Sequence, residues 1–93
     1  MLQGFPDVQK APTDVIDVTL DWTPFLPSGT TGLASHSVST DLGDVIAADT
    51  GASGLKQTLR LTLGSISTFT QVTARVTTAG GLDFSRSFNA LVR

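Results

Sequence analysis

The stretch DVIDVTLDW, residues 14–22, decides the fold of this chain. Its apolar residues Ile16, Val18, Leu20 and Trp22 alternate with polar ones. This period of two predicts a β-strand from about Val15 to Trp22 with one apolar face and one solvated face. Trp22 is the only tryptophan of the chain, so we expect it to anchor the core.

Further short strands follow, separated by glycine, proline and serine. The expected strands are Leu33–Ser39, with Ala34, His36 and Val38 on one face, Asp44–Asp49, Lys56–Leu63, Thr70–Thr77 and Leu82–Val92. Residues 50–54 are expected to form a loop, and the Ala79-Gly80-Gly81 segment a hairpin turn. No segment has a convincing helical period.

This pattern of about six or seven short strands is typical of an immunoglobulin-like antiparallel β-sandwich. A small barrel is the alternative. The sandwich is expected to span residues 14–93. Residues 1–13 are expected to form an extended N-terminal arm, because Pro6 and Pro12 disfavour helix at and before their positions. This arm either packs loosely or becomes ordered on a neighbouring subunit.

Two later strands supply apolar stripes that Trp22 can pack against. They are Leu59, Leu61 and Leu63 in one strand and Val72, Ala74 and Val76 in the other.

The last strand leaves two possibilities. Either Phe84, Phe88, Ala90 and Val92 all face inward with Arg86 as an exception, or a bulge near Arg86 resets the alternation. The bulge, or an exposed first half of the strand, is favoured because Arg86 would otherwise be buried without an evident partner.

The charge pattern argues against two classes of partner. Charged residues make up 15% of the chain, the net charge is −2, and the six basic residues form no run. A nucleic-acid-binding protein uses a basic surface to neutralise phosphates. Binding to DNA, RNA or anionic membranes is therefore disfavoured. The chain has no cysteine, which excludes disulfides and thiolate sites.

Catalytic or metal-binding chemistry has little support in the sequence. His36 is the only histidine, and its neighbours Ser35 and Ser37 would point to the opposite face of a strand. Aspartates at positions 14, 17 and 21 are better interpreted as solvated strand carboxylates than as a metal site. No enzyme activity and no cofactor are expected.

The sequence suggests a few residues for contacts with other proteins. In the arm these are Phe5, Pro6, Lys10 and Pro12, and in the last strand Phe84. Phe25 and Phe69 are instead expected to pack in the core or at corners of the fold.

Several segments together resemble a family of short tailed-phage virion proteins, the fibre–tail adaptor or head–tail collar proteins. The resemblance lies in residues 10–22 with the two-proline corner that ends at Leu26, in Thr62–Ser65, in residues 72–81, and in Arg86-Ser87-Phe88. The chain departs from the family at His36, where a second tryptophan is usual, and over residues 41–54.

The resemblance implies a non-enzymatic structural protein of the virion, located at the head–tail junction or tail and present in multiple copies. Its implied partners are the portal or connector ring, a tail fibre or spike, and copies of itself. The alternatives are a capsid decoration protein with the same fold and, with less support, a host-surface or carbohydrate-binding module.

Overall fold

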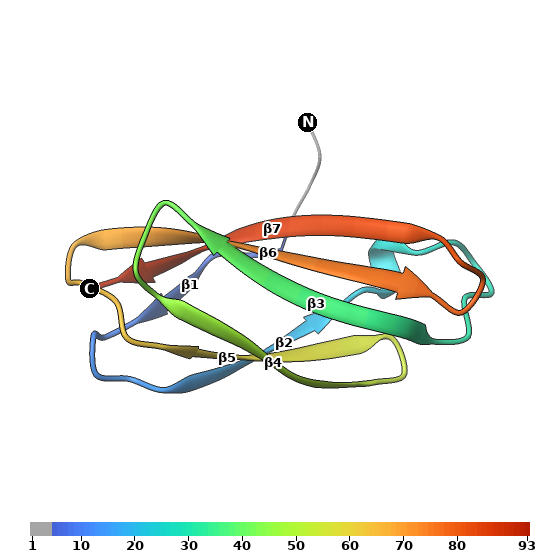
Figure 1. Ribbon diagram of the computed structural model, residues 1–93, viewed down its shortest axis with the longest axis horizontal. Helices are drawn as coiled ribbons and strands as arrows, with labels where there is room; N and C mark the ends of the chain where they lie inside the picture. Colours follow the sequence, from blue (N-terminus) through green and yellow to red (C-terminus); the bar gives the residue numbers. More distant parts are fainter. Residues whose placement is uncertain (1–4) are drawn as a thin grey trace.

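A computed structural model describes residues 5–93 as an all-β protein of seven strands in two packed sheets (Figure 1). The strands are β1 (Val8–Lys10), β2 (Ile16–Asp21), β3 (Leu33–Asp41), β4 (Ile46–Ser53), β5 (Lys56–Thr62), β6 (Thr68–Thr78) and β7 (Asp83–Val92). One 3₁₀ turn, η1 (Thr23–Phe25), follows β2 at the corner with the prolines.

The two sheets have the strand orders β1-β7-β6-β3 and β2-β5-β4. If β2 to β7 are lettered B to G, these are the C-F-G and B-E-D sheets of the immunoglobulin arrangement. The predicted sandwich is therefore confirmed. It is antiparallel except for β1, which pairs in parallel with β7.

Strand β1 changes the expected division between arm and sandwich. The sequence predicts that residues 1–13 lie outside the sandwich, whereas Val8 and Lys10 pair with Ala90 and Val92 in the larger sheet. Lys10 is buried, and its ammonium group donates hydrogen bonds to the carbonyl oxygens of Ala11 and Leu63. The edge of the sandwich thus lies before β1. Residues 1–4 of the expected arm lie outside the described residues.

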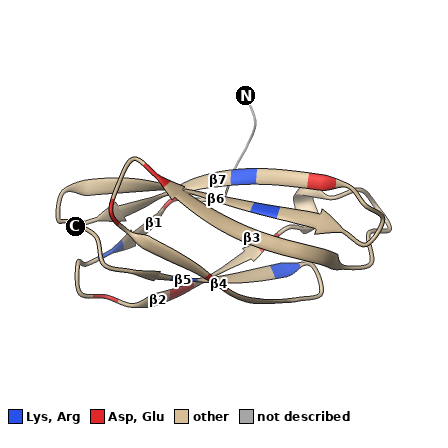
Figure 2. Cartoon of the chain, in the orientation of Figure 1, with Lys and Arg blue, Asp and Glu red and all other residues tan. Residues whose placement is uncertain are grey.

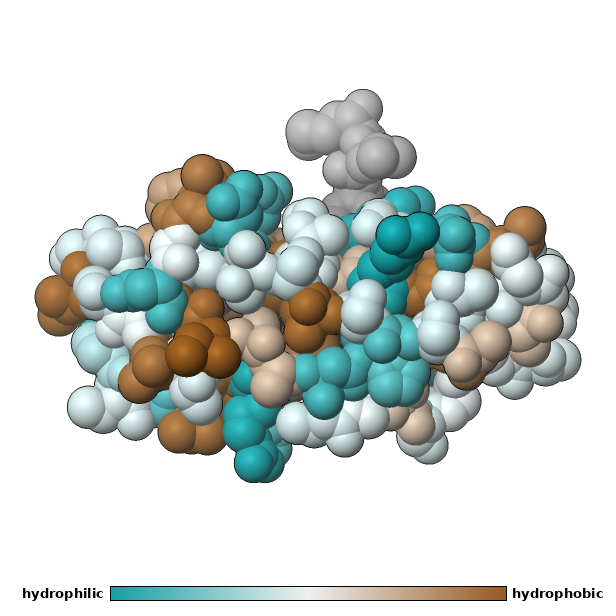
Figure 3. Space-filling view, viewed as in Figure 1, coloured by the Kyte–Doolittle hydropathy of each residue, from teal (hydrophilic) through white to brown (hydrophobic). Residues whose placement is uncertain are grey.

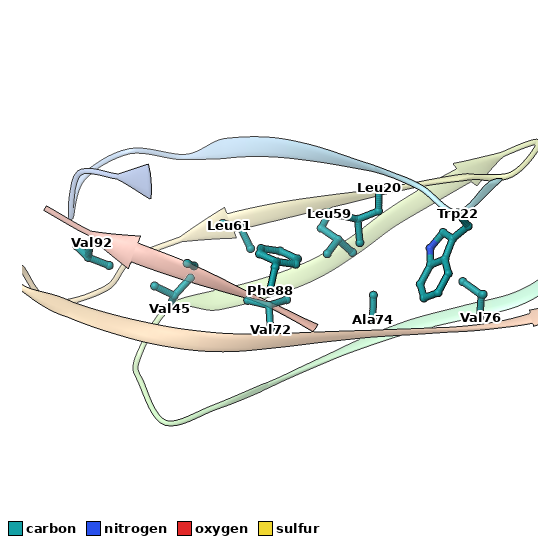
Figure 4. Packing of buried hydrophobic residues seen from close by; sticks show 11 residues of the cluster. Leu20, Trp22, Val45, Leu59, Leu61, Val72, Ala74, Val76, Phe88 and Val92 are labelled. Carbon is teal, nitrogen blue, oxygen red and sulfur yellow. The ribbon is translucent and has the colours of Figure 1, made fainter. Parts of the chain in front are cut away.

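The core lies between the two sheets and is continuous along the molecule (Figure 4). Both predicted stripes contribute to it, except for one residue. The buried apolar residues are Leu20, Trp22, Val45, Leu59, Leu61, Val72, Ala74, Val76, Phe88, Ala90 and Val92.

The expected inward position of Leu63 is wrong. Strand β5 ends at Thr62, and Leu63 has a φ of 63° that turns its side chain out of the strand alternation. The prediction of a loop at residues 50–54 is also wrong for most of that segment. Strand β4 continues to Ser53 through a register shift between Asp49 and Gly51.

In β3, Ala34 does not share the half-buried face of His36 and Val38, as had been expected. A register shift between Leu33 and Ser35 resets the alternation, so Ala34 is exposed and Leu33 packs against the core instead.

The bulge favoured near Arg86 is absent. Strands β6 and β7 pair without a register shift from Thr68 to Thr77, and Arg86 lies opposite Ala74. Arg86 therefore keeps the phase of the inward-facing residues, but the first half of β7 contains no fully buried residue, in line with the other favoured possibility of an exposed first half. Its guanidinium group lies over the ring of Phe25, 5.2 Å from the centroid.

A chain of hydrogen bonds joins the two sheets beside the core. The indole nitrogen of Trp22 donates to the side-chain oxygen of Gln57 over 3.1 Å. The Gln57 amide nitrogen donates to Asp49 and to the carbonyl of Ser37, and Asp49 also bonds His36. The chain thus runs from Trp22 at the end of β2, through β5 and β4, to β3 in the opposite sheet.

Replacing Trp22 tests how much of the stability depends on this residue. We expect Trp22→Ala to lower the free energy of unfolding by about 3–5 kcal/mol, since a large buried side chain is lost. Trp22→Phe should cost less, because it keeps most of the apolar contact but leaves the buried Gln57 oxygen without its donor. Urea denaturation measures both. A Trp22→Ala protein as stable as the wild type would contradict a central role for this side chain.

The Asp49 carboxylate should make stability depend on pH. Burial alone would raise the pKa of Asp49, but hydrogen bonds from His36, Gln57 and the Gly51 amide outweigh it and hold the pKa below its ordinary value of 3.8. A lowered pKa in the folded state contributes stability above pH 3.8 that is lost as the pH falls through the folded-state pKa. We expect Asp49→Asn to destabilise the protein at neutral pH and to lose less stability than the wild type on acidification. Urea titrations at several pH values measure this, and equal acid sensitivity of both proteins would contradict it.

Candidate functional site

Exposed apolar side chains gather at one end of the sandwich. Seven large hydrophobic residues of the described chain are exposed, and six of them lie at or beside the end that holds the β3–β4 and β5–β6 loops and the C terminus. Figure 3 shows one face of the molecule, on which hydrophobic residues gather toward this end. These six, which we term the apolar end, are Val15, Leu42, Ile46, Leu63, Ile66 and Phe69, and each is 46–68% exposed. Leu82, in the β6–β7 hairpin, lies at the opposite end.

The loops of the apolar end are tied to one another by hydrogen bonds. The carboxylate of Asp44, in the β3–β4 loop, accepts hydrogen bonds from the amide and hydroxyl of Ser65 in the β5–β6 loop. The Val45 amide donates to the Thr70 hydroxyl over 3.1 Å, and the Ser67 amide donates to the carbonyl of Val92. The exposed residues are therefore held on a shaped surface.

Two glycines allow these loops to pack closely. A Cβ atom at Gly43 would lie 2.4 Å from the carbonyl oxygen of Phe69. At Gly64, where φ is 112°, it would lie 2.7 Å from the Val92 side chain. Each glycine follows an exposed leucine. The pair Leu42-Gly43 lies in the β3–β4 loop and the pair Leu63-Gly64 in the β5–β6 loop, both at the apolar end.

Backbone strain is concentrated in the same loops. The described non-glycine residues with positive φ are Leu42 at 67°, Leu63 at 63° and Ser67 at 63°. This conformation costs a side-chain-bearing residue about 1–2 kcal/mol. Neither leucine recovers that cost by burial within the chain, because both are exposed. Strain of this kind tends to be retained where it serves function.

The apolar end is bordered by acidic residues. Asp14 and Asp44 lie in loops at this end, and Asp41 is the last residue of β3. Figure 2 shows acidic residues in this part of the molecule. Hydrogen bonds from Ser65 hold the pKa of Asp44 below its usual value. Arg93 is the exposed basic residue here, since Lys10 is buried. The surface is thus apolar at its centre and predominantly negative around it.

The residues suggested by the sequence for protein contacts lie elsewhere or are covered. Phe5 packs edge-on against Trp22 with ring centroids 5.0 Å apart, and Pro6 is exposed beside it. Phe84 and Pro12 are partly buried, while Lys10 is buried. Phe69 is exposed, contrary to the expectation of core or corner packing.

The sequence does carry a signal for the apolar end. Both strained leucines precede a glycine at the end of a strand pattern, which is where a chain leaves the strand. Strand alternation predicts an inward Leu63, because the alternation considers only the spacing of apolar residues. It does not take account of where the backbone leaves the strand. The turn at Gly64 determines where that side chain points.

The described residues contain neither a cluster of three or more metal-ligating side chains nor a helix long and apolar enough to cross a membrane. Asp49 and His36 are joined, but their remaining partners are Gln57 and the Gly51 amide, so no nucleophile is within this network. The fold and its exposed surfaces define an immunoglobulin-like module built for protein contacts.

Comparison with protein families gives the particular family. A family model described as podophage GP4 fiber-tail adaptor protein gp77 matches residues 10–90, and the chain belongs to this family. It is therefore a non-enzymatic structural component of the phage virion that acts in the tail as a fibre–tail adaptor, which confirms the resemblance seen in the sequence. No curated protein matches the chain.

The two strained leucines give a prediction about stability. Asparagine adopts positive φ more readily than leucine does. We therefore expect Leu42→Asn and Leu63→Asn, alone and together, to keep the free energy of unfolding within about 1 kcal/mol of the wild type or to raise it. Urea denaturation measures this. A large loss of stability would show that these side chains support the fold of the isolated chain.

Proposed function

We propose that the apolar end attaches this adaptor to a structural protein of the tail or connector ring, leaving the sides of the sandwich for the fibre. The observation that carries the proposal is the position of the exposed apolar residues, six of which share one end. Two of these six are leucines held in a strained backbone conformation.

The energetics favour a lasting attachment. Complete burial of a leucine, isoleucine or phenylalanine side chain contributes about 1.5–3 kcal/mol, and the six residues of the apolar end are each about half exposed before binding. The hydrogen bonds between their loops exist already in the free chain. Binding therefore has to order few additional groups, which lowers its entropic cost.

The charges around the apolar end specify the chemistry of the partner. A complementary surface has an apolar centre with lysine or arginine residues around it, since opposite charges across an interface favour the correct pairing. Two copies of this chain placed end to end would bring Asp14, Asp41 and Asp44 of both copies together. This repulsion favours a different protein as the partner at this end.

The attachment can be tested with a double variant and a matched control. Leu42→Asn/Leu63→Asn removes two apolar side chains from the apolar end, whereas Leu82→Asn removes an equally large exposed side chain from the opposite end. We expect the double variant to lose incorporation into tails by at least about tenfold, since two buried leucines are lost from the interface. Leu82→Asn should assemble normally.

Incorporation is measured by complementing a phage that lacks the adaptor gene and quantifying the adaptor in purified particles. Circular dichroism establishes that each variant is folded. Normal incorporation of the folded double variant would refute the proposal, and so would an equal loss for Leu82→Asn. Self-association of the purified wild-type chain that the double variant abolishes would show that the apolar end binds a second copy instead.

A further inference from the structure

A groove opens along the side of the sandwich, away from the apolar end. It has a volume of about 670 Å³ and lies where the segment leading into β1 faces β2 and the η1 turn. Its lining is largely apolar and includes Phe5, Val8, Val18, Leu20 and Phe25. Phe5 and Phe25 form an aromatic wall of the groove, and both pack edge to face against each other and against the buried Trp22, with centroids 5.0–6.0 Å apart.

Arg86 is the one cation among the residues that line this groove. Its guanidinium group stacks on Phe25, and one terminal nitrogen donates to the neighbouring Ser85 carbonyl over 2.7 Å. The Nε atom is buried and has no hydrogen-bond acceptor among the described residues. A guanidinium group has five N–H donors, so most of the donor capacity of Arg86 is unused.

Two carboxylates also line the groove, but neither pairs with Arg86. Asp7 accepts a hydrogen bond from the Asn89 amide, and Asp21 accepts one from the Thr23 amide, each over 3.0 Å. Asp7 precedes β1, whereas Asp21 ends β2 in the other sheet. The groove thus presents a cation from β7 together with an acidic residue from each side.

A buried donor with a positive charge and no acceptor is costly, and a carboxylate is the group that satisfies it best. Arginine and carboxylate form two parallel hydrogen bonds in one plane, and the contact with the Phe25 ring, 5.2 Å from its centroid, holds the guanidinium group beside the groove. The two terminal nitrogens carry the other N–H donors, and their one hydrogen bond within the described residues goes to the Ser85 carbonyl, so these nitrogens retain donors for a ligand. The apolar lining would cover residues on either side of that carboxylate.

We propose that this groove binds an extended peptide segment of the tail fibre, whose carboxylate pairs with Arg86 while flanking apolar side chains contact the aromatic wall. Residues next to that carboxylate that are neutral or basic would avoid repulsion from Asp7 and Asp21. The fibre is chosen as the source because the family is described as joining fibre to tail, and the proposed function assigns the apolar end to the tail, which leaves the groove for the other partner. This inference rests on the proposed adaptor function, in which the apolar end contacts the tail, and it assigns the groove as the contact with the fibre.

The test uses overlapping synthetic peptides that tile the fibre protein of the same phage, with binding to the full chain followed by fluorescence anisotropy. We expect a peptide containing aspartate, glutamate or a free C-terminal carboxylate to bind. Arg86→Gln should weaken that binding at least about tenfold, and Arg86→Lys should weaken it less. The control Arg75→Gln removes an exposed arginine from the adjacent strand and should leave binding unchanged.

Neutralising the carboxylate of the bound peptide completes a double-mutant cycle. It should weaken binding to the wild type but have little further effect on Arg86→Gln, since the pair is already broken. In addition, the Arg86 Nε–H resonance in nitrogen–proton spectra should shift on addition of the acidic peptide. A merely structural arginine would show neither coupling nor this shift.

Folding and assembly controls keep the outcomes separate. Arg86→Met removes the charge with an apolar side chain of similar length, so its denaturation midpoint should equal or exceed that of the wild type while peptide binding is lost. The Leu42→Asn/Leu63→Asn variant should bind the peptide normally, so failure at the apolar end and failure at the groove are distinguishable.

Absence of any binding peptide, or peptide binding that does not depend on Arg86 or on the peptide carboxylate, would overturn the inference. Binding of a tail-protein peptide in place of a fibre peptide would overturn its source.

Discussion

The fold depends on burying one indole between two sheets without leaving its nitrogen unpaired. Trp22 is fully buried, and Gln57, itself buried, accepts the hydrogen bond of its ring nitrogen. Gln57 can serve because its amide group is held in turn by Asp49 and by the Ser37 carbonyl. Trp22 thus buries its apolar ring and keeps its ring nitrogen hydrogen-bonded at the same position. The hydrogen bonds that continue from Gln57 to Ser37 and Asp49 also hold the two sheets, which share few backbone hydrogen bonds, in a fixed arrangement.

Much of this architecture was predictable because alternation in a strand reports directly which side chains face the core. The stripes through Leu59 and Val72 and the role of Trp22 in the core follow from that rule. The rule failed where the backbone departs from a strand. Leu63 turns outward at positive φ, and Ala34 is displaced by a register shift. Such changes depend on pairing with distant segments, which no local pattern reveals.

The surfaces proposed for protein contacts were harder to predict for a related reason. Arg86 follows the inward pattern but was expected to avoid it, because nothing in the sequence shows that Phe25 from a distant turn supplies a stacking partner. The prolines of residues 1–13 predict an extended arm outside the sandwich, yet β1 pairs with β7 and Lys10 is buried. In both cases the deciding partner lies far away along the chain. The family resemblance, by contrast, rested on local segments and was sufficient to identify the adaptor class.

The four outer strands of the two sheets have a further consequence for how copies of this chain meet one another. Strand β1 has three residues, β2 carries Asp17 and Asp21, and β3 and β4 each contain a register shift. Short, charged or irregular edges are poor templates for another strand. Copies that accumulate in an infected cell are thereby discouraged from joining edge to edge into open-ended aggregates.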